Sequence, residues 1–393
     1  ASFANLGIKK VPVETRIIKN NRKLLTSGVW CIVSLGYEAT DGKDSPWLIE
    51  SLKPIQISQI DISEYKEARK SFTTDEWVNL LMQSIGLNPE HFNFRSKLIQ
   101  LSRLIPFCEN NYNLIELGPK GTGKSHIYSE LSPHGILISG GEVTQAKLFV
   151  NNSTGQIGLV GFWDTVAFDE FGGSSKSGEK GLVDIMKNYM ANKSFSRGTH
   201  VYTASASMVF VGNTEHSLAY MMRKTNLFDA LPKQYYDTAF LDRIHSYLPG
   251  WEVNKLRTEM FTNGYGFIVD YLAEVLRELR KDDFTNLAGE YFRLSDSLTT
   301  RDRDAIVKTF SGLVKIIYPN KDLTEEQARQ LFEFSMELRK RVKLELIKMD
   351  DTFEKVSFSY RDRASDNDHK IRTIEEISFQ TDNDQSQEQG HDQ

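Results

Sequence analysis

The chain has 393 residues, of which 39% are hydrophobic and 26% are charged, and its formal net charge is −5. This composition is ordinary for a globular protein, and the length suggests two or three domains. The acidic balance excludes nucleic-acid binding through overall charge, so such a contact needs a local basic patch.

Cysteine content and hydropathy restrict the class of protein further. Cys31 and Cys108 are too few and too far apart for a disulfide framework or a zinc site, and their apolar surroundings predict buried thiols in a reducing compartment. No apolar run approaches the roughly 20 residues that span a bilayer, and no signal peptide is present. We therefore expect a cytoplasmic protein with no membrane partner. Because the chain opens at Ala1 without a methionine, we expect a fragment or a processed form.

Residues 1–62 are predicted to form a β-rich region. Trp30–Leu35 and Trp47–Leu52 have the composition of strands, and the polar segment Thr40–Asp44 supplies a turn between them. Pro54–Ile57 is a third candidate strand. The region also carries basic residues that either face phosphate or form an ordinary solvated surface: Lys9, Lys10, Arg16, Lys19, Arg22 and Lys23.

A helical linker is predicted over residues 63–106. Thr73–Glu76 is a capping box, and Phe72 and Trp77 are spaced for a hydrophobic staple at the start of the first helix. A second helix is expected over Phe94–Leu104 and should end at Pro106.

Strand and helix patterns alternate over residues 107–250, which predicts an α/β core with a mostly parallel sheet covered by helices. The predicted strands are Leu114–Leu117, Gly135–Ser139, Val166–Phe168 and Ser207–Val211. The predicted helices are Ser125–Leu131, Thr144–Phe149 and Gly181–Ala191.

A helical lid is predicted over residues 251–349, and a polar tail over residues 350–393. The lid helices are Phe267–Arg280, Arg301–Ile317 and Leu323–Met349, the last of which opens with a capping box. Lys355–Tyr360 has the composition of a short strand. From about Ala364 onward we expect weak order, because too little apolar surface is available to offset the chain entropy.

One segment of the core, the phosphate loop, carries a complete G-x-x-x-x-G-K-[ST] motif after an apolar run. Its glycines let the backbone fold into a cradle of N–H groups around phosphate oxygens. Lys124 is expected to reach the β- and γ-phosphates of ATP, and Ser125 to bind Mg²⁺. The expected nucleotide-binding residues are Gly118, Pro119, Lys120, Gly121, Thr122, Gly123, Lys124, Ser125 and His126. The alternative is a glycine-rich turn that binds nothing.

Two later strands end in polar residues suited to hydrolysis of a bound nucleotide. After Val166–Phe168, Asp169 is expected to bind Mg²⁺ and Glu170 to polarise the attacking water. Asn213 ends the next apolar strand, where its amide can orient that water and sense the γ-phosphate. The alternatives are a solvated turn for the acidic pair and a turn-forming role for Asn213.

Two arginines are candidates for contacts with the γ-phosphate. Arg243 would stabilise transition-state charge if a neighbouring subunit supplied it, and an internal salt bridge with Asp242 is the alternative. Arg301 opens a lid helix and can couple the position of the lid to the nucleotide state. We prefer Arg301 to Arg303 for this role.

This order of motifs resembles that of AAA+ ATPases, with Walker A at Gly118–Ser125, Walker B at Asp169 and Glu170, sensor 1 at Asn213, the arginine finger at Arg243 and sensor 2 at Arg301. Longer stretches are similar to a narrower family, the Lon-like AAA+ proteins of BREX phage-defence systems (the BrxL family). These stretches are Pro46–Ser58, Phe72–Pro89, Ile115–Ser129, Gly135–Leu148, Gly158–Phe171, Asp184–Arg197 and Met208–Asn213.

The resemblance implies a DNA-binding ATPase that forms hexameric rings, which can stack in pairs as a dodecamer, and that works with other BREX components. It also implies an N-terminal region similar to that of MCM helicases, here a partial oligonucleotide-binding fold that faces DNA. Family members normally continue into a Lon-protease-like domain. After Met349 this chain shows no serine in a Gly/Ala-rich loop with a downstream lysine, so we expect no peptidase activity.

By the same resemblance, residues 193–202 occupy the position of a hairpin that points into the pore of MCM-like and Lon-like rings. Lys193, Arg197 and His200 are candidates for contacts with a DNA backbone, with Phe195 packing nearby. A surface hairpin with ordinary charges is the alternative. Thr144 and Lys147 lie where a second pore-facing segment is expected.

Two other functions are compatible with these motifs. The first is a protein unfoldase or remodeller that partners a protease, which Lon-like ancestry favours and the lack of an obvious aromatic pore loop disfavours. The second is a scaffold on DNA that uses the nucleotide only as a lock. Glu170 argues against a pure lock, because a lock does not need a catalytic base.

Overall fold

The computed structural model describes residues 1–3, 6, 8–20, 31–39, 45–54, 60–139, 143–151, 153, 155, 157–169, 180–197 and 200–377. The chain divides into two compact units, Ala1–Ile60 and Asp61–Gln393.

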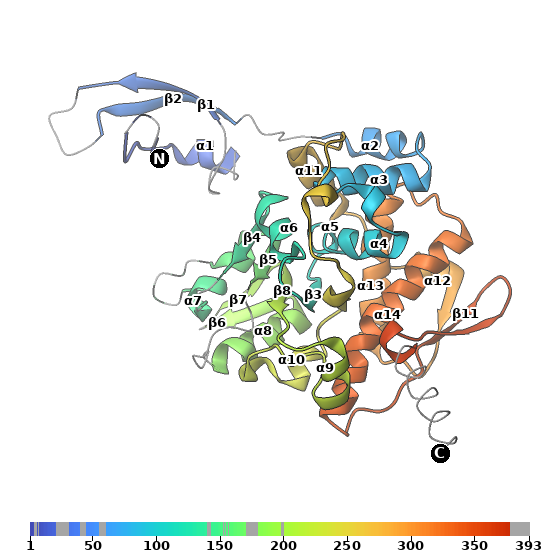
Figure 1. Cartoon of the computed structure of the whole chain (residues 1–393). Helices are drawn as coiled ribbons and strands as arrows, with labels where there is room; N and C mark the ends of the chain where they lie inside the picture. Colours follow the sequence, from blue (N-terminus) through green and yellow to red (C-terminus); the bar gives the residue numbers. More distant parts are fainter. Residues whose placement is uncertain are drawn as a thin grey trace, which may run out of the picture. The chain divides into compact units, whose positions relative to one another are not determined.

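The first unit contains the helix α1 (Thr15–Asn20) and an antiparallel pair of strands, β1 (Cys31–Tyr37) and β2 (Trp47–Pro54) (Figure 1). The rings of Tyr37 and Trp47, which lie opposite each other in this pair, have centroids 5.1 Å apart. Both predicted strands are confirmed, whereas α1 was not predicted. The expected turn at residues 40–44, most of the third candidate strand and the basic residues Arg22 and Lys23 lie outside the described residues.

The second unit begins with helices α2 (Ile62–Arg69), α3 (Thr74–Ser84), α4 (Phe94–Ser102) and α5 (Ile105–Cys108). The capping box at Thr73 is present, and the Phe72 and Trp77 rings pack 5.6 Å apart, which confirms the predicted staple. The prediction that Pro106 ends the second helix is wrong. The helix α4 stops earlier, and Pro106 lies in the first turn of α5, where a missing N–H costs no helical hydrogen bond.

A five-stranded parallel sheet forms the centre of this unit, in the order β4-β5-β8-β3-β9. Its strands are β3 (Asn113–Gly118), β4 (Gly135–Ile138), β5 (Thr165–Phe168), β8 (Ser207–Asn213) and β9 (Ser246–Pro249). The α/β fold and four of these strands are confirmed, and β9 was not predicted. Because every strand runs the same way, the carboxyl ends of all five meet at one edge.

Helices pack around this sheet and bury its apolar residues (Figure 1). They are α6 (Lys124–Glu130), α7 (Gln145–Leu148), α8 (Lys180–Asn192), α9 (Leu218–Lys224) and α10 (Thr238–Leu241). A hairpin follows α8, formed by β6 (Ser194–Arg197) and β7 (His200–Thr203). Short 3-10 turns lie at Pro89–His91, Leu159–Gly161, Lys233–Tyr235, Gly250–Glu252 and Thr258–Met260.

The region predicted as a lid is helical, with α11 (Val269–Leu279), α12 (Ala288–Tyr291), α13 (Thr300–Ile317) and α14 (Glu325–Met349). The helices α13 and α14 lie side by side (Figure 1). The helix α14 also contacts β9 of the sheet. Many charged residues of α14 are buried, among them Arg339, Arg341 and Glu345. The long helix is therefore part of the core and not only a cover over it.

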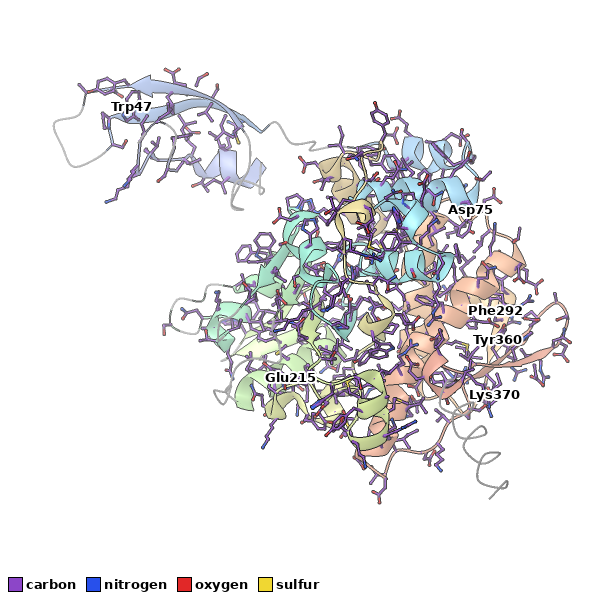
Figure 2. The ribbon with its side chains drawn as sticks, viewed as in Figure 1. Trp47, Asp75, Glu215, Phe292, Tyr360 and Lys370 are labelled. Carbon is purple, nitrogen blue, oxygen red and sulfur yellow. The ribbon has the colours of Figure 1, made fainter. Side chains whose placement is uncertain are left out.

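A small antiparallel sheet packs on this helical region. It consists of β10 (Phe292–Leu294), β11 (Ser359–Asp362) and β12 (Asp368–Lys370). Figure 2 shows Phe292 and Tyr360 together, and their ring centroids are 5.2 Å apart. The strand predicted at Lys355–Tyr360 is wrong over most of its length, because the chain pairs only from Ser359 onward.

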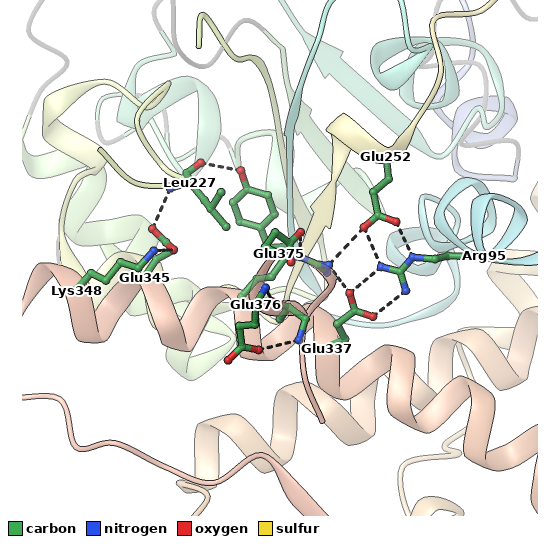
Figure 3. A network of polar contacts seen from close by, with 11 residues as sticks. Arg95, Leu227, Glu252, Glu337, Glu345, Lys348, Glu375 and Glu376 are labelled. Carbon is green, nitrogen blue, oxygen red and sulfur yellow. Dashed lines mark hydrogen bonds and ion pairs between the residues drawn. The ribbon is translucent and has the colours of Figure 1, made fainter. Parts of the chain in front are cut away.

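The expectation of weak order from Ala364 is wrong for the part of the tail that extends to residue 377. Glu375 is 1% exposed and pairs with Arg341 at 3.0 Å, while Glu376 pairs with Lys340 at 2.6 Å. Figure 3 shows this network, which extends through Glu337 to Arg95 and Glu252. Ion pairs with buried cations of α14 thus order a segment that has little apolar surface of its own. Residues 378–393 lie outside the described residues.

Candidate nucleotide-binding site

The phosphate loop connects β3 to α6 and uses its glycines for backbone conformation and close packing. Gly121 and Gly123 have φ angles of +81° and +75°, in the left-handed region that other residues adopt at a cost. A Cβ atom on Gly118 would lie 2.5 Å from the carbonyl carbon of Gly250. The motif glycines are therefore required by this geometry, with or without a ligand.

Lys124 begins α6 and its side chain is only 6% exposed. Its ammonium donates to the carbonyl oxygens of Pro119 at 2.6 Å and Gly118 at 3.1 Å. Burial lowers the pKa of Lys124, and the carboxylates of Glu116 and Asp169 oppose this shift. The cation is thus held at the centre of the loop, where it can meet an anion.

A cavity of about 340 Å³ opens over the loop. It is lined by Lys120, Gly121, Thr122, Gly123, Lys124, Ser125, His126, Asp169 and Asn213. Gly118 and Pro119 belong to the loop but not to this lining, and their carbonyls face the Lys124 ammonium instead. The N-cap residue of α6 is Gly123, which has no side chain to accept from the first N–H groups of the helix, so these groups can donate to another acceptor.

The topology of the sheet brings Asp169 and Asn213 to this cavity. Asp169 follows β5 directly, and its backbone N–H donates to the carbonyl of Ile138 at 2.8 Å. Asn213 ends β8 and is paired in register with Gly118, the first residue of the motif. Both residues therefore stand at the carboxyl edge, as expected for strands β5 and β8 beside β3. Glu170 lies outside the described residues.

These residues fit a magnesium nucleotide better than a metal ion alone. Among the described residues, no group of three His, Cys, Asp or Glu could hold a metal ion. Mg²⁺ is commonly bound by one or two protein ligands together with substrate phosphates. Ser125 and Asp169 supply such a small ligand set, and Lys124 with the loop backbone suits the phosphates.

A buried ion pair between Arg103 and Glu116, which was not predicted, also contacts the phosphate loop. Arg103 donates to both carboxylate oxygens of Glu116, at 2.9 and 2.6 Å, and to the carbonyl of Thr122 at 3.2 Å. The N–H of Leu256 donates to the carbonyl of Gly121 at 2.9 Å. No local signal distinguishes Arg103 from an exposed arginine, since its burial depends on residues distant in the sequence.

The structure does not bring Arg243 and Arg301 to this cavity. Asn113, the first residue of β3, donates from its amide to the carbonyl of Arg243 at 3.0 Å, so Arg243 stands at the amino edge of the sheet. Arg301 pairs there with Asp242. Burial and then the nearby Arg301 guanidinium lower the pKa of Arg243, which places the two cations close together.

Arg303 has local partners instead. Its guanidinium donates to the carbonyl of Ser295 at 2.6 Å and to that of Leu298 at 3.2 Å. These bonds fix the loop before α13. Arg301, by contrast, has a side chain that is 52% exposed.

The predicted hairpin at residues 193–202 is present as β6 and β7. Phe195 is 3% exposed and packs against Phe149 and Tyr202, with centroids 5.1 and 5.5 Å apart. Lys193 and His200 are exposed, and Arg197 ends β6. Phe195 is therefore the anchor of the hairpin and not a surface aromatic.

A five-stranded parallel sheet with a glycine-rich phosphate loop, an aspartate and an asparagine at one edge defines a P-loop ATPase core. Residues 47–359 match the family model described as "Lon-like protease BrxL-like, ATPase domain", and residues 1–37 match "BREX system Lon protease-like protein BrxL N-terminal". The chain belongs to the BrxL family.

Two curated relatives carry the name "Lon-like protease BrxL". The relative from Bacillus cereus (strain H3081.97) is 48% identical over 381 residues, which is 96% of this chain and 56% of the relative. The relative from Escherichia coli O9:H4 (strain HS) is 46% identical over 367 residues, or 93% of this chain and 53% of the relative. The chain thus spans about half the length of these relatives. Among the described residues, no helix is both long and apolar enough to cross a membrane.

Proposed function

We propose that the chain is the ATP-hydrolysing subunit of a cytoplasmic ring that acts on DNA in BREX-type phage defence. One observation supports this proposal above the others. The cavity over the phosphate loop and the pair Arg243 and Arg301 lie at opposite edges of the same sheet. With β3 rising about 3.3 Å per residue, the edges are about 16 Å apart.

This separation means that the two arginines cannot serve the cavity of their own chain. Placing two guanidinium groups together is unfavourable unless anions are nearby. Asp242 supplies one negative charge, and the Nε of Arg243 is a buried donor without a partner among the described residues. The phosphates of a neighbouring copy would supply the remaining charge. Both arginines are therefore proposed to act on the next subunit, and Arg303 is not.

Within one chain, we assign one role to each residue of the site. Lys124 and the loop backbone would bind the phosphates, and Ser125 and Asp169 would hold Mg²⁺, which would supply positive charge at those phosphates. Asn213 orients the attacking water, and Glu170 accepts its proton. Arg243 and Arg301 of the neighbour stabilise the transition state, so hydrolysis depends on assembly into a ring.

Action on DNA is supported by the hairpin and by the family. The hairpin is held on the core through Phe195 and exposes Lys193 and His200 to a backbone, with Arg197 beside them in sequence. The hexamer, its stacking as a dodecamer and contacts with other BREX components are part of the same proposal. Peptidase activity is not proposed for the residues of this chain.

The test is ATP hydrolysis with and without duplex DNA, at two salt concentrations. Wild-type protein should hydrolyse ATP faster with DNA, and less so at high salt. Glu170→Gln should keep ATP binding and lose turnover, whereas the matched variant Glu290→Gln, at an exposed position of α12, should keep both. Stimulation by unfolded protein rather than DNA would favour a protein remodeller and contradict the proposal.

A further inference from the structure

Arg339 of α14 is completely buried and bonds to the residues on both sides of Arg243. Its guanidinium donates to the carbonyl oxygens of Asp242 at 3.1 Å and Ile244 at 2.6 Å. It also donates to the Asp242 carboxylate at 2.7 Å. The backbone of the segment that carries Arg243 is therefore held from the core by Arg339 on both sides of Arg243, and by the Asn113 amide at the Arg243 carbonyl itself.

The same guanidinium also bonds to the first turn of α13. Its Nε donates to Asp302 at 2.8 Å, and Asp302, which is also fully buried, follows Arg301 directly in the chain. The second oxygen of the Asp242 carboxylate accepts from Arg301. Arg339 and Asp242 thus link the half-buried Arg243 and the exposed Arg301, which come from segments nearly 60 residues apart in sequence, to one buried guanidinium.

An arginine is required for this arrangement. Its planar fork presents five donors in fixed directions, and here four of its bonds reach two carboxylates and two carbonyls. A lysine or an apolar residue could fill the space but could not hold both segments in one geometry. A buried polar network in which each group has its hydrogen-bond partner favours a single arrangement of the segments that it joins.

We propose that Arg339 and Asp242 are positioning residues, which place Arg243 and Arg301 for contact with the phosphates of a neighbouring copy. This inference rests on the proposed function, because it assumes that the two arginines act between subunits. Both positioning residues are buried, at 0% exposure for Arg339 and 6% for Asp242, and neither lines the cavity over the phosphate loop. The bonds of Arg339 also connect α14 to the segments that carry Arg243 and Arg301. A shift of α14 would therefore move both of these arginines together.

The experiment mixes subunits with complementary defects. Lys124→Ala subunits have a defective cavity but keep Arg243 and Arg301. Arg243→Ala subunits keep an intact cavity but lack the arginine that acts on the neighbouring subunit. Each should be inactive alone, and their mixture should recover activity, which is the control for action between subunits. No recovery in this control would contradict the proposed function itself.

Asp242→Asn is the principal variant, because asparagine keeps the shape and one acceptor for Arg339. It should bind ATP with unchanged affinity and lower kcat by about 100-fold, the scale of a misplaced catalytic group. Mixing it with Lys124→Ala subunits should restore activity well above the sum of the two alone. Arg339→Gln should behave in the same way if it folds, as judged by its melting temperature.

Arg341→Gln is the matched control for loss of a buried arginine from the same helix. Arg341 is 1% exposed and pairs with Glu337 and Glu375, away from the Arg243 segment. Arg341→Gln should lower the melting temperature about as much as Arg339→Gln. Any ATPase activity that Arg341→Gln loses should not be restored by mixing it with Lys124→Ala subunits. Failure of Asp242→Asn to recover on mixing, with the Arg243→Ala control recovering, would overturn the assignment of Arg339 and Asp242.

Discussion

The buried pair of Arg103 and Glu116 makes the most quantitative prediction about the site. Both side chains are almost fully buried, at 2% and 0% exposure. Arg103→Met removes the hydrogen-bonded cation and leaves the Glu116 carboxylate in the core without its ion-pair partner. Breaking a buried pair in this way costs about 3–5 kcal/mol, whereas replacing both partners by apolar residues is often neutral or stabilising. Arg103→Met with Glu116→Leu should therefore regain most of the lost stability.

Urea denaturation without nucleotide measures this effect. With a slope of about 3 kcal/mol/M, the loss of about 3–5 kcal/mol means that the single variant should unfold at about 1–1.7 M less urea than wild type, and the double variant close to wild type. A second measurement separates stability from the site. Both variants lose the bond from Arg103 to the Thr122 carbonyl, so both should bind ATP more weakly. A double variant as unstable as the single one would refute the reasoning, as would ATP affinity unchanged in both.

Three further predictions concern the phosphate loop, the hairpin and the half-buried amine of Lys308. Lys124→Ala should weaken ATP binding by about tenfold or more in a fluorescent-analogue titration, because it removes a charge-assisted contact. Replacing Lys193 and His200 by serine should lower DNA affinity and flatten its dependence on salt, with ATP affinity unchanged. Burial lowers the pKa of Lys308 to about 8, against about 10.5 in an unfolded chain. Between these values the unfolded state binds more protons, so the unfolding free energy should rise from pH 8 to 9.5, and rise less in Lys308→Met.

Much of the nucleotide site could be predicted from the sequence because parallel strands share an edge. The phosphate loop, Asp169 and Asn213 each follow an apolar run, and the order of the strands then places them around one cavity. The starts of α3 and α14 could also be predicted from the sequence, because the capping boxes at Thr73 and Thr324 involve residues within one turn of the helix.

The edge at which Arg243 and Arg301 lie could not be predicted. It depends on β9, a strand of four residues that ends in Pro249 and offers no alternation to detect. It depends also on where α13 packs, which is decided by contacts between distant segments. The order of the tail could not be predicted for a similar reason, because it comes from partners distant in sequence: β12 pairs with β11, and Glu375 and Glu376 pair with Arg341 and Lys340 of α14.

In the proposed ring, each nucleotide site is completed by a second copy of the chain. Particle mass and ATPase rate, measured together over a range of protein concentrations with and without duplex DNA, test it most directly. The proposal predicts little hydrolysis by single chains and a rise in rate per subunit as rings form. Full hydrolysis by a species with the mass of one chain would contradict it.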